Sequence, residues 1–150
     1  MSQPGLRVLQ ALHEDWQAVA SLVSCIGAMH PESLQGEDAA TLVARLCARL
    51  YVLSHVETEL LYPSLAQCPG LCSGLALHEH MVTNLQALLD AVVDQEEFGG
   101  PLRALLDRVH SLRRFEDLEV YPFCVGADID SIGEQMAHRR HQLLESFNTE

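Results

Sequence analysis

The sequence predicts an all-α protein: an up-down-up-down four-helix bundle with a short fifth helix at its C-terminal end. Apolar residues recur at helical spacing along nearly the whole chain, and no stretch alternates as a strand would. Apolar residues, mostly Leu, Ala and Val, make up 48% of the chain and aromatic residues only 5%, a composition that favours packed helices. Long helices with short connections favour antiparallel neighbours, which is the up-down arrangement.

The helices are separated where Gly and Pro cluster, and we expect them to form a single domain over residues 1–150. The breaks are expected at His30-Pro31, Cys68-Pro69-Gly70, Phe98-Gly99-Gly100-Pro101 and Gly126-Ala127-Asp128. The helices are expected at residues 6–29, about 37–66, about 73–95, about 101–122 and about 130–147, with the core bundle over about 6–122.

Charge and the N-terminal residues exclude several partners. The formal net charge is −12 and all nine basic residues are arginines, so no face can offer the cationic surface that nucleic acids and anionic lipids require. No apolar run approaches the roughly 20 residues that span a bilayer, and the first residues do not read as a secretory signal. We expect a soluble, cytoplasmic protein that binds neither nucleic acid nor membrane. A protein partner or a homodimer is left open.

Two acidic residues fall within apolar stripes. At about 100° per residue, Glu57 lies near the middle of the apolar arc of the second helix, and Glu116 near that of the fourth. Both lie six residues before the Pro of a Tyr-Pro helix end, a weak internal repeat. Two carboxylates in one core must be neutralised by protonation, a partner or a metal. The alternative is that Glu116 pairs with Arg113 and Glu57 reaches solvent.

Two histidines occupy matching places on the other helices. His13 flanks the apolar stripe of the first helix and His78 lies beside that of the third, each three residues before a large apolar residue. Imidazoles and carboxylates on facing helices are the donors with which helical bundles hold iron-type ions. The candidate metal ligands are therefore His13, Glu57, His78 and Glu116, although a lone histidine in such a place is more often a surface or core residue. Tyrosines near these helix ends can donate hydrogen bonds to the site.

These motifs resemble the hemerythrin-like (HHE cation-binding) family. Leu-His-Glu-Asp-Trp around His13 looks like the family's first motif, and residues 57–63, Glu-Thr-Glu-Leu-Leu-Tyr-Pro, look like its Glu-Glu-x-x-Leu-Phe/Tyr-Pro helix end. His78 and the repeat from Glu116 to Pro122 follow in the family's order, so the resemblance spans most of the chain. It implies a di-iron site with one His from each of helices one and three and a His-x-x-x-Glu pair from each of helices two and four.

The chain departs from the family pattern at two of these ligands. With the Tyr-Pro ends as anchors, the histidines of the two His-x-x-x-Glu pairs fall on Leu53 and Leu112. Two His and two Glu remain, which suffices for one metal ion, or for two ions with few protein ligands and more solvent. The site is expected to hold mononuclear or dinuclear non-haem iron, another divalent metal, or none.

A second register competes with this one. His55 and Glu59 form a literal His-x-x-x-Glu, although His55 falls nearly opposite the main apolar arc of its helix. His80 competes with His78, because the family often shows Glu-His at this point, but the two lie about 160° apart on a helical wheel and cannot both reach one ion. The fourth-helix pair of the competing register would be Phe115 and Glu119, again without a histidine.

The resemblance implies a protein that binds or senses dioxygen, nitric oxide or peroxide, or that holds iron; whether it is an enzyme is left open. A second hypothesis is a metal-free bundle with a structural or regulatory role, since replacement of two ligands by Leu is what loss of a metal would produce. A third is a redox role for Cys68 and Cys72, which flank Pro69-Gly70. The five cysteines are otherwise interpreted as small core residues of a reduced protein.

Overall fold

The computed structural model describes residues 6–29, 37–125 and 129–148, and over these residues the protein is helical, with no strand. The all-α prediction is therefore confirmed for this part of the chain. The predicted breaks at His30-Pro31 and Gly126-Ala127-Asp128 lie outside the described residues. The long helices are α1 (Leu6–Gly27), α2 (Glu37–Val56), α3 (Leu71–Val93), α4 (Gly99–Phe115) and α5 (Asp130–Asn148).

Helices α2 and α4 end in two irregular turns, which the sequence did not predict. Each passes into one π turn and then into a short 3-10 turn that contains the Pro of the Tyr-Pro end. Proline cannot continue a regular helix, because it has no N–H and its ring collides with the carbonyl four residues back. The π turns are Glu57–Leu61 and Glu116–Val120, and the 3-10 turns are Tyr62–Ser64 and Tyr121–Cys124.

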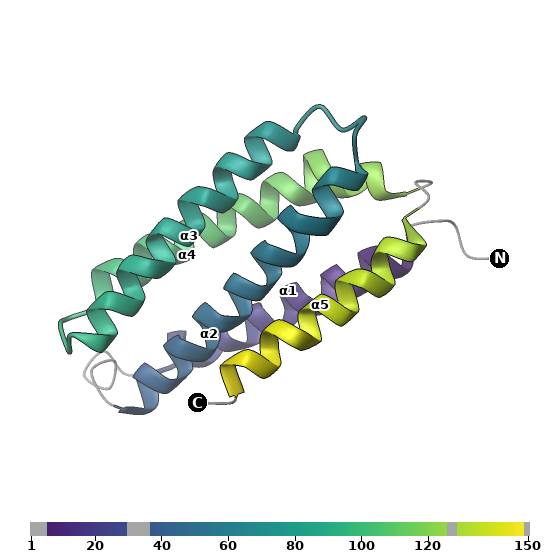
Figure 1. The fold of residues 1–150 in the computed structure, drawn as a ribbon. Helices are drawn as coiled ribbons and strands as arrows, with labels where there is room; N and C mark the ends of the chain where they lie inside the picture. The colour runs from purple at the N-terminus through teal and green to yellow at the C-terminus, as the bar shows by residue number, and fades with distance from the viewer. Residues whose placement is uncertain (1–5, 30–36, 126–128, 149–150) are drawn as a thin grey trace.

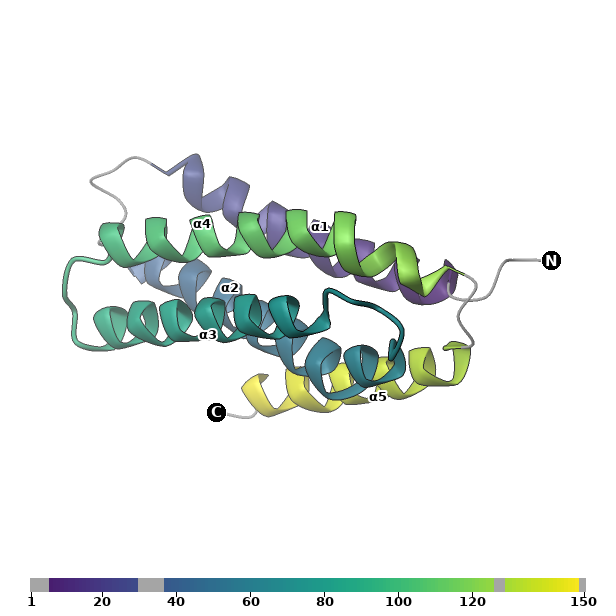
Figure 2. The same cartoon turned by 90° about the horizontal axis from the view of Figure 1, so that it is seen from above.

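Consecutive helices run in opposite directions along a common long axis (Figure 1). Helix α3 packs along α4 and helix α1 along α2, while α2 also contacts α3. Helix α5 lies against α2 and α1, and in Figure 1 it lies on the side away from α3 and α4. In the view from above, α1 and α4 lie at one edge of the molecule and α5 lies at the other (Figure 2). The expected position of the C-terminal helix, laid against the preceding ones, is confirmed by these contacts.

The core is formed by one apolar stripe from each helix. On α1 the stripe consists of Val8, Leu12, Trp16, Val19 and Ile26. Three of the five cysteines, Cys47, Cys68 and Cys124, are buried among apolar side chains as predicted. Full burial of a Leu or Ile side chain contributes roughly 1.5–3 kcal/mol, so these stripes account for the packing of the helices.

One stretch, Asp38–Ser64, is long and apolar enough by composition to cross a membrane. This corrects the expectation that no run approaches such a length, since the stretch reaches a mean hydropathy of 1.2 although isolated charged residues interrupt it. The stretch is α2 with its two final turns, and half of its most apolar window is buried inside the protein. A core helix of a soluble protein has the same properties.

Candidate metal centre

The two π turns align each glutamate with the tyrosine five residues later. The backbone N–H of Tyr62 donates to the carbonyl oxygen of Glu57, and the N–H of Tyr121 donates to that of Glu116. This i to i+5 hydrogen bond replaces the regular i to i+4 bond and keeps both side chains directed at the core. The repeated Glu…Tyr-Pro sequence therefore produces two equivalent helix ends, each carrying a buried carboxyl group and a buried phenol.

Three ionisable side chains meet between these ends. Glu57 and Glu116 are 0% exposed and His78, from α3, is 2% exposed. His78 Nε2 lies 3.1 Å from Glu57 Oε2 and 3.3 Å from Glu116 Oε2. The other ring nitrogen, Nδ1, lies 3.0 Å from Ser54 Oγ, which fixes the orientation of the ring. One ligand atom from each of the three residues lies within 4.8 Å of the others, a grouping that could hold a metal ion.

The two tyrosines reach across to the glutamate of the opposite helix end. Tyr62 donates from its hydroxyl to Glu116 Oε2 at 2.8 Å. The Tyr121 hydroxyl lies 2.6 Å from Glu57 Oε1 and 3.1 Å from Glu116 Oε1. It also accepts a hydrogen bond of 2.7 Å from Trp16 Nε1 of α1. Side chains from α1, α2, α3 and α4 are thus joined in one buried polar network.

The pKa values of the two carboxyl groups and the imidazole are shifted in different directions. Burial, together with the charge and hydrogen bond of Glu116, raises the pKa of Glu57 well above its usual range. Burial alone would also raise the pKa of Glu116, but hydrogen bonds from Glu57, His78 and Tyr62 lower it. Burial opposes the charged form of His78, yet the two carboxylates raise its pKa to about 9. These shifts favour a neutral acid at Glu57 beside a carboxylate at Glu116 and an imidazolium at His78, an arrangement without net charge.

Three of the four residues predicted as metal ligands come together in this cluster. The fourth prediction is corrected: His13 is exposed, and its Nε2 lies 3.1 Å from Gln17 Nε2. Leu12 and Trp16 lie on the buried face of α1. His13 follows Leu12 in the chain, so its side chain is rotated by about 100° away from Leu12 on the helix. Trp16, which was predicted only as an apolar core residue, contacts the network in place of His13.

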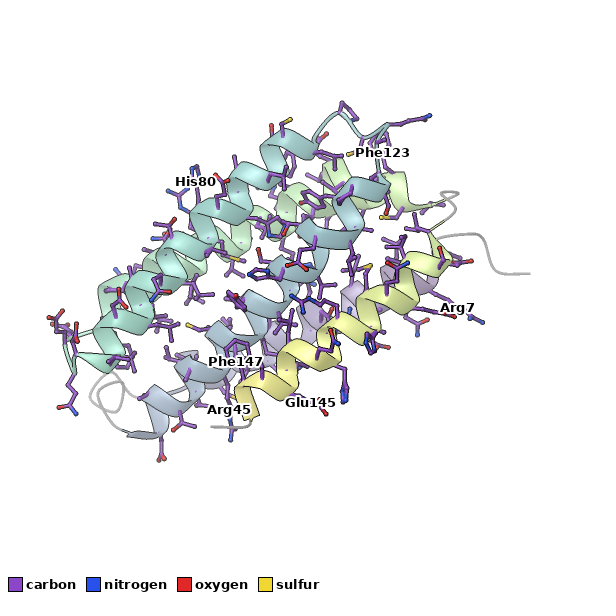
Figure 3. The ribbon with its side chains drawn as sticks, viewed as in Figure 1. Arg7, Arg45, His80, Phe123, Glu145 and Phe147 are labelled. Carbon is purple, nitrogen blue, oxygen red and sulfur yellow. The ribbon has the colours of Figure 1, made fainter. Side chains whose placement is uncertain are left out.

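The structure also separates the two competing registers. His55 and Glu59 form a surface pair at 2.9 Å, with side chains 35% and 41% exposed. Glu119 is exposed, and so is His80, which points outward from α3 (Figure 3). The two positions at which the resemblance implies histidines, Leu53 and Leu112, are buried and apolar. The alternative in which Glu116 pairs with Arg113 is not observed, because Arg113 lies over the Trp16 ring, 5.9 Å from its centroid.

Sequence reasoning missed Trp16 and Ser54 as members of the network. The only signal for Trp16 is that a buried indole N–H needs an acceptor, and the sequence does not name that acceptor. Ser54 lies one turn before Glu57 on α2, a place that the helical wheel shares with several apolar residues. The two cysteines singled out earlier differ in surroundings: Cys72 is exposed, whereas the Cys68 thiol is buried and donates to the Glu119 carbonyl.

A groove of about 520 Å³ between α2 and α3 approaches the cluster from outside. The buried residues Ser54 and His78 line it together with the exposed residues Glu79 and Thr83. Of the three clustered residues, His78 alone lines this groove and has any exposed surface. The groove therefore brings solvent to the outer side of the His78 imidazole.

No protein-family model matches the chain, and no match was found among curated proteins or among solved structures. The fold and the site together define an all-helical protein with a fully buried Glu-His-Glu cluster at the junction of four helices.

Proposed function

We propose that this chain is a metal-binding protein of the non-haem iron type, in which Glu57, His78 and Glu116 hold a divalent ion inside a hemerythrin-like up-down four-helix bundle. The observation that carries the proposal is the convergence of three ligand atoms from three helices at a site closed to solvent. Carboxylates and imidazole are the donors that suit iron, manganese and zinc. The resemblance of the helix ends to the hemerythrin-like family favours iron among these.

The spacing of the ligand atoms supports the proposal. An ion with bonds of about 2.0–2.2 Å holds neighbouring ligand atoms about 2.8–3.6 Å apart. The two distances from His78 Nε2, to Glu57 Oε2 and Glu116 Oε2, are 3.1 Å and 3.3 Å. Rigid helices hold these atoms, so little rearrangement is needed for binding.

Charge balance supports it as well. Without a metal, the cluster carries the proton of Glu57 and the second ring proton of His78. A divalent ion that replaces these two protons leaves the net charge of the buried site unchanged, so binding need not place an uncompensated charge in the core. The same three side chains can therefore bind either two protons or one divalent ion.

Three protein ligands leave positions open on a four- to six-coordinate ion. A bound iron ion would supply one-electron chemistry and a place for dioxygen, nitric oxide, peroxide or water. The groove between α2 and α3 is wide enough for such small molecules. We place the protein in the cytoplasm, where its five free cysteines would stay reduced.

Elemental analysis of protein purified without chelators tests the proposal, together with absorption spectra before and after exposure to air. The wild type is expected to carry a stoichiometric ion, and the double variant Glu57→Ala with Glu116→Ala is expected to carry none. The matched control is Glu59→Ala with Glu119→Ala, which removes two exposed carboxylates from the same helix ends and should retain the ion. Stoichiometric metal in the Glu57/Glu116 variant would contradict the proposal.

Loss of metal must be separated from loss of fold. The conservative pair Glu57→Gln with Glu116→Gln keeps the shape of both side chains and removes their charges. Circular dichroism should show both double variants as helical, and added metal should raise the melting temperature of the wild type and the control only. A metal-dependent rise in the Gln variant would also count against these ligands.

A second candidate is a metal-free structural or regulatory module. It is favoured by the hydrogen bonds of the cluster, in which both carboxyl groups, the imidazole and both phenols have partners without any ion. This candidate predicts no stoichiometric metal after purification. It also predicts that Glu57→Leu leaves stability unchanged or raises it, because apolar residues often replace buried polar groups without loss.

A further inference from the structure

The pair of carboxyl groups has two edges, and different residues occupy them. The Oε2 edge faces His78 Nε2, at 3.1 Å from Glu57 and 3.3 Å from Glu116. The Oε1 edge faces the Tyr121 hydroxyl, at 2.6 Å from Glu57 and 3.1 Å from Glu116. Two ions bridged by two carboxylates would need both edges, one ion on each. The Tyr121 phenol lies against both Oε1 atoms, whereas the Tyr62 phenol contacts the Oε2 atom of Glu116 alone.

Trp16 fixes the direction of the Tyr121 hydroxyl. An indole N–H can only donate, so the Trp16 Nε1 contact of 2.7 Å makes the phenol oxygen an acceptor. The hydroxyl hydrogen must then point away from the indole, towards the two Oε1 atoms. A proton and its oxygen therefore stand where a second ion would have to bind. Tyr121 is 8% exposed and Trp16 1% exposed, so the packing of the core restricts both side chains.

The position four residues before each glutamate carries a leucine, which offers no ligand atom to a metal ion. Leu53 precedes Glu57 by four residues and Leu112 precedes Glu116 by four, and both leucines are buried. In a helix these positions share a face with the glutamates, so they are where additional ligands would come from. The leucines therefore leave the Oε1 edge to the Tyr121 hydroxyl.

We propose that Tyr121, held by Trp16, is the positioning residue that closes the Oε1 edge and limits the centre to one divalent ion. This inference rests on the proposed metal site. It assigns the nuclearity of that site, which the sequence left open between one ion and two.

Tyr62 provides an internal comparison. Its hydroxyl donates to one carboxylate only, at Glu116 Oε2, and leaves the Oε1 edge untouched. Tyr62→Phe and Tyr121→Phe therefore remove the same atom from equivalent helix ends, but only the second uncovers the Oε1 edge. This makes Tyr62→Phe the matched control.

The test is a titration of full-length, metal-free protein with Mn²⁺, with bound ions per chain measured by equilibrium dialysis. Electron paramagnetic resonance reports whether two Mn²⁺ ions are spin-coupled, as ions about 3.5–4 Å apart are. We expect one uncoupled ion per chain in the wild type and in Tyr62→Phe. We expect two ions per chain, spin-coupled, in Tyr121→Phe.

The number of bound ions tests the limit of one ion per chain separately from metal binding itself. Two ions in the wild type would overturn the inference and leave the proposed function standing. One ion in Tyr121→Phe would also overturn it, because the hydroxyl would then not be what limits the site. No ion in the wild type would end the proposed function itself. If Tyr121→Phe does not fold, Trp16→Phe decides, since it frees the hydroxyl to turn: a second ion supports the role of Tyr121, and a single ion contradicts it.

Discussion

The two helix ends that carry the site share one sequence pattern and one local structure, yet their glutamates ionise oppositely. Glu57 has a raised pKa and Glu116 a lowered one. Both are buried, and both accept hydrogen bonds from Tyr121 and His78, but Glu116 has Tyr62 in addition. Two carboxyl groups that share one proton must differ, and the extra donor favours the charge on Glu116. The repeated motif thus determines where the two carboxyl groups lie, whereas their hydrogen-bond partners from other helices determine which of them is protonated.

His78 on α3 and His13 on α1 also occupy matching places in the sequence but differ in burial. Both precede a large apolar residue by three positions, yet His78 is buried beside two carboxyl groups and His13 is exposed beside Gln17. A rotation of about 100° around the helix axis, which is one residue, is enough to turn a side chain from the buried face to solvent. Changes that remove one histidine, one charge or one close contact can therefore separate structural roles that look equivalent in the sequence.

The largest effect is expected from His78→Ala. Removal of the imidazolium leaves a buried carboxylate without its cationic partner, which costs about 3–5 kcal/mol of the unfolding free energy of metal-free protein. His13→Ala, the matched control, should change it by less than about 0.5 kcal/mol, because His13 is exposed. Urea unfolding measures both, and similar losses in the two variants would contradict the assignment of His78 to the buried cluster.

The stability of metal-free protein should fall as the pH rises from about 6.5 to about 9. The pKa of His78 is raised to about 9 in the folded state, so its contribution is complete below the unfolded value near 6.5 and is lost through pH 9. The loss attributable to His78 is about 3 kcal/mol. Urea unfolding of wild type and His78→Gln across this range isolates it, and parallel curves would show that the imidazole is not charged in the fold.

Glutamine at the two glutamate positions should be tolerated unequally. Glu57→Gln replaces a protonated acid by a neutral side chain of similar shape, so a loss of about 1 kcal/mol or less is expected. Glu116→Gln removes the carboxylate that balances the imidazolium, and its loss should be about 2 kcal/mol greater. The comparison is made at pH 6.5 without metal. Equal losses, or the reverse order, would mean that the proton is not held on Glu57.

Gly74→Ala should produce a smaller loss than His78→Ala. A Cβ atom at Gly74 would lie 2.7 Å from the Tyr62 hydroxyl oxygen, so the Tyr62 ring, whose hydroxyl donates to Glu116, must shift. Overpacking of about 1–3 kcal/mol is partly offset by a helix-propensity gain of about 1 kcal/mol. Gly100→Ala in α4, with nothing within 4 Å, is the control and should lose no stability. Thermal unfolding compares the melting temperatures of the two variants with that of the wild type. A stabilised Gly74→Ala variant would show that the Tyr62 ring can move without loss of stability.

Much of the fold and part of the site could be predicted from hydrophobic periodicity. The helices and the buried phase of Glu57 and Glu116 follow from it, because each glutamate comes directly after the last regular residue of α2 or α4, where steps of 100° still hold. His13 fails the same test, since a residue at the flank of a stripe is turned inward or outward by one step. The two π turns change that period, and no periodic argument anticipates them.

The remaining site residues could not be predicted, because they depend on distances between helices. The bond from Trp16 to Tyr121 joins residues 105 positions apart, and that from Tyr62 to Glu116 joins residues 54 apart. A helical wheel describes one helix at a time. It shows that a polar group is buried, but the partner that satisfies it is known only once the helices are packed.

Anomalous X-ray diffraction at the zinc edge, from crystals of protein loaded with Zn²⁺, tests the central claim most directly. We expect one strong peak per chain, about 2.0–2.2 Å from Glu57 Oε2, His78 Nε2 and Glu116 Oε2. Zinc found only at surface residues such as His55 and Glu59, with the buried cluster still joined by its hydrogen bonds, would contradict it.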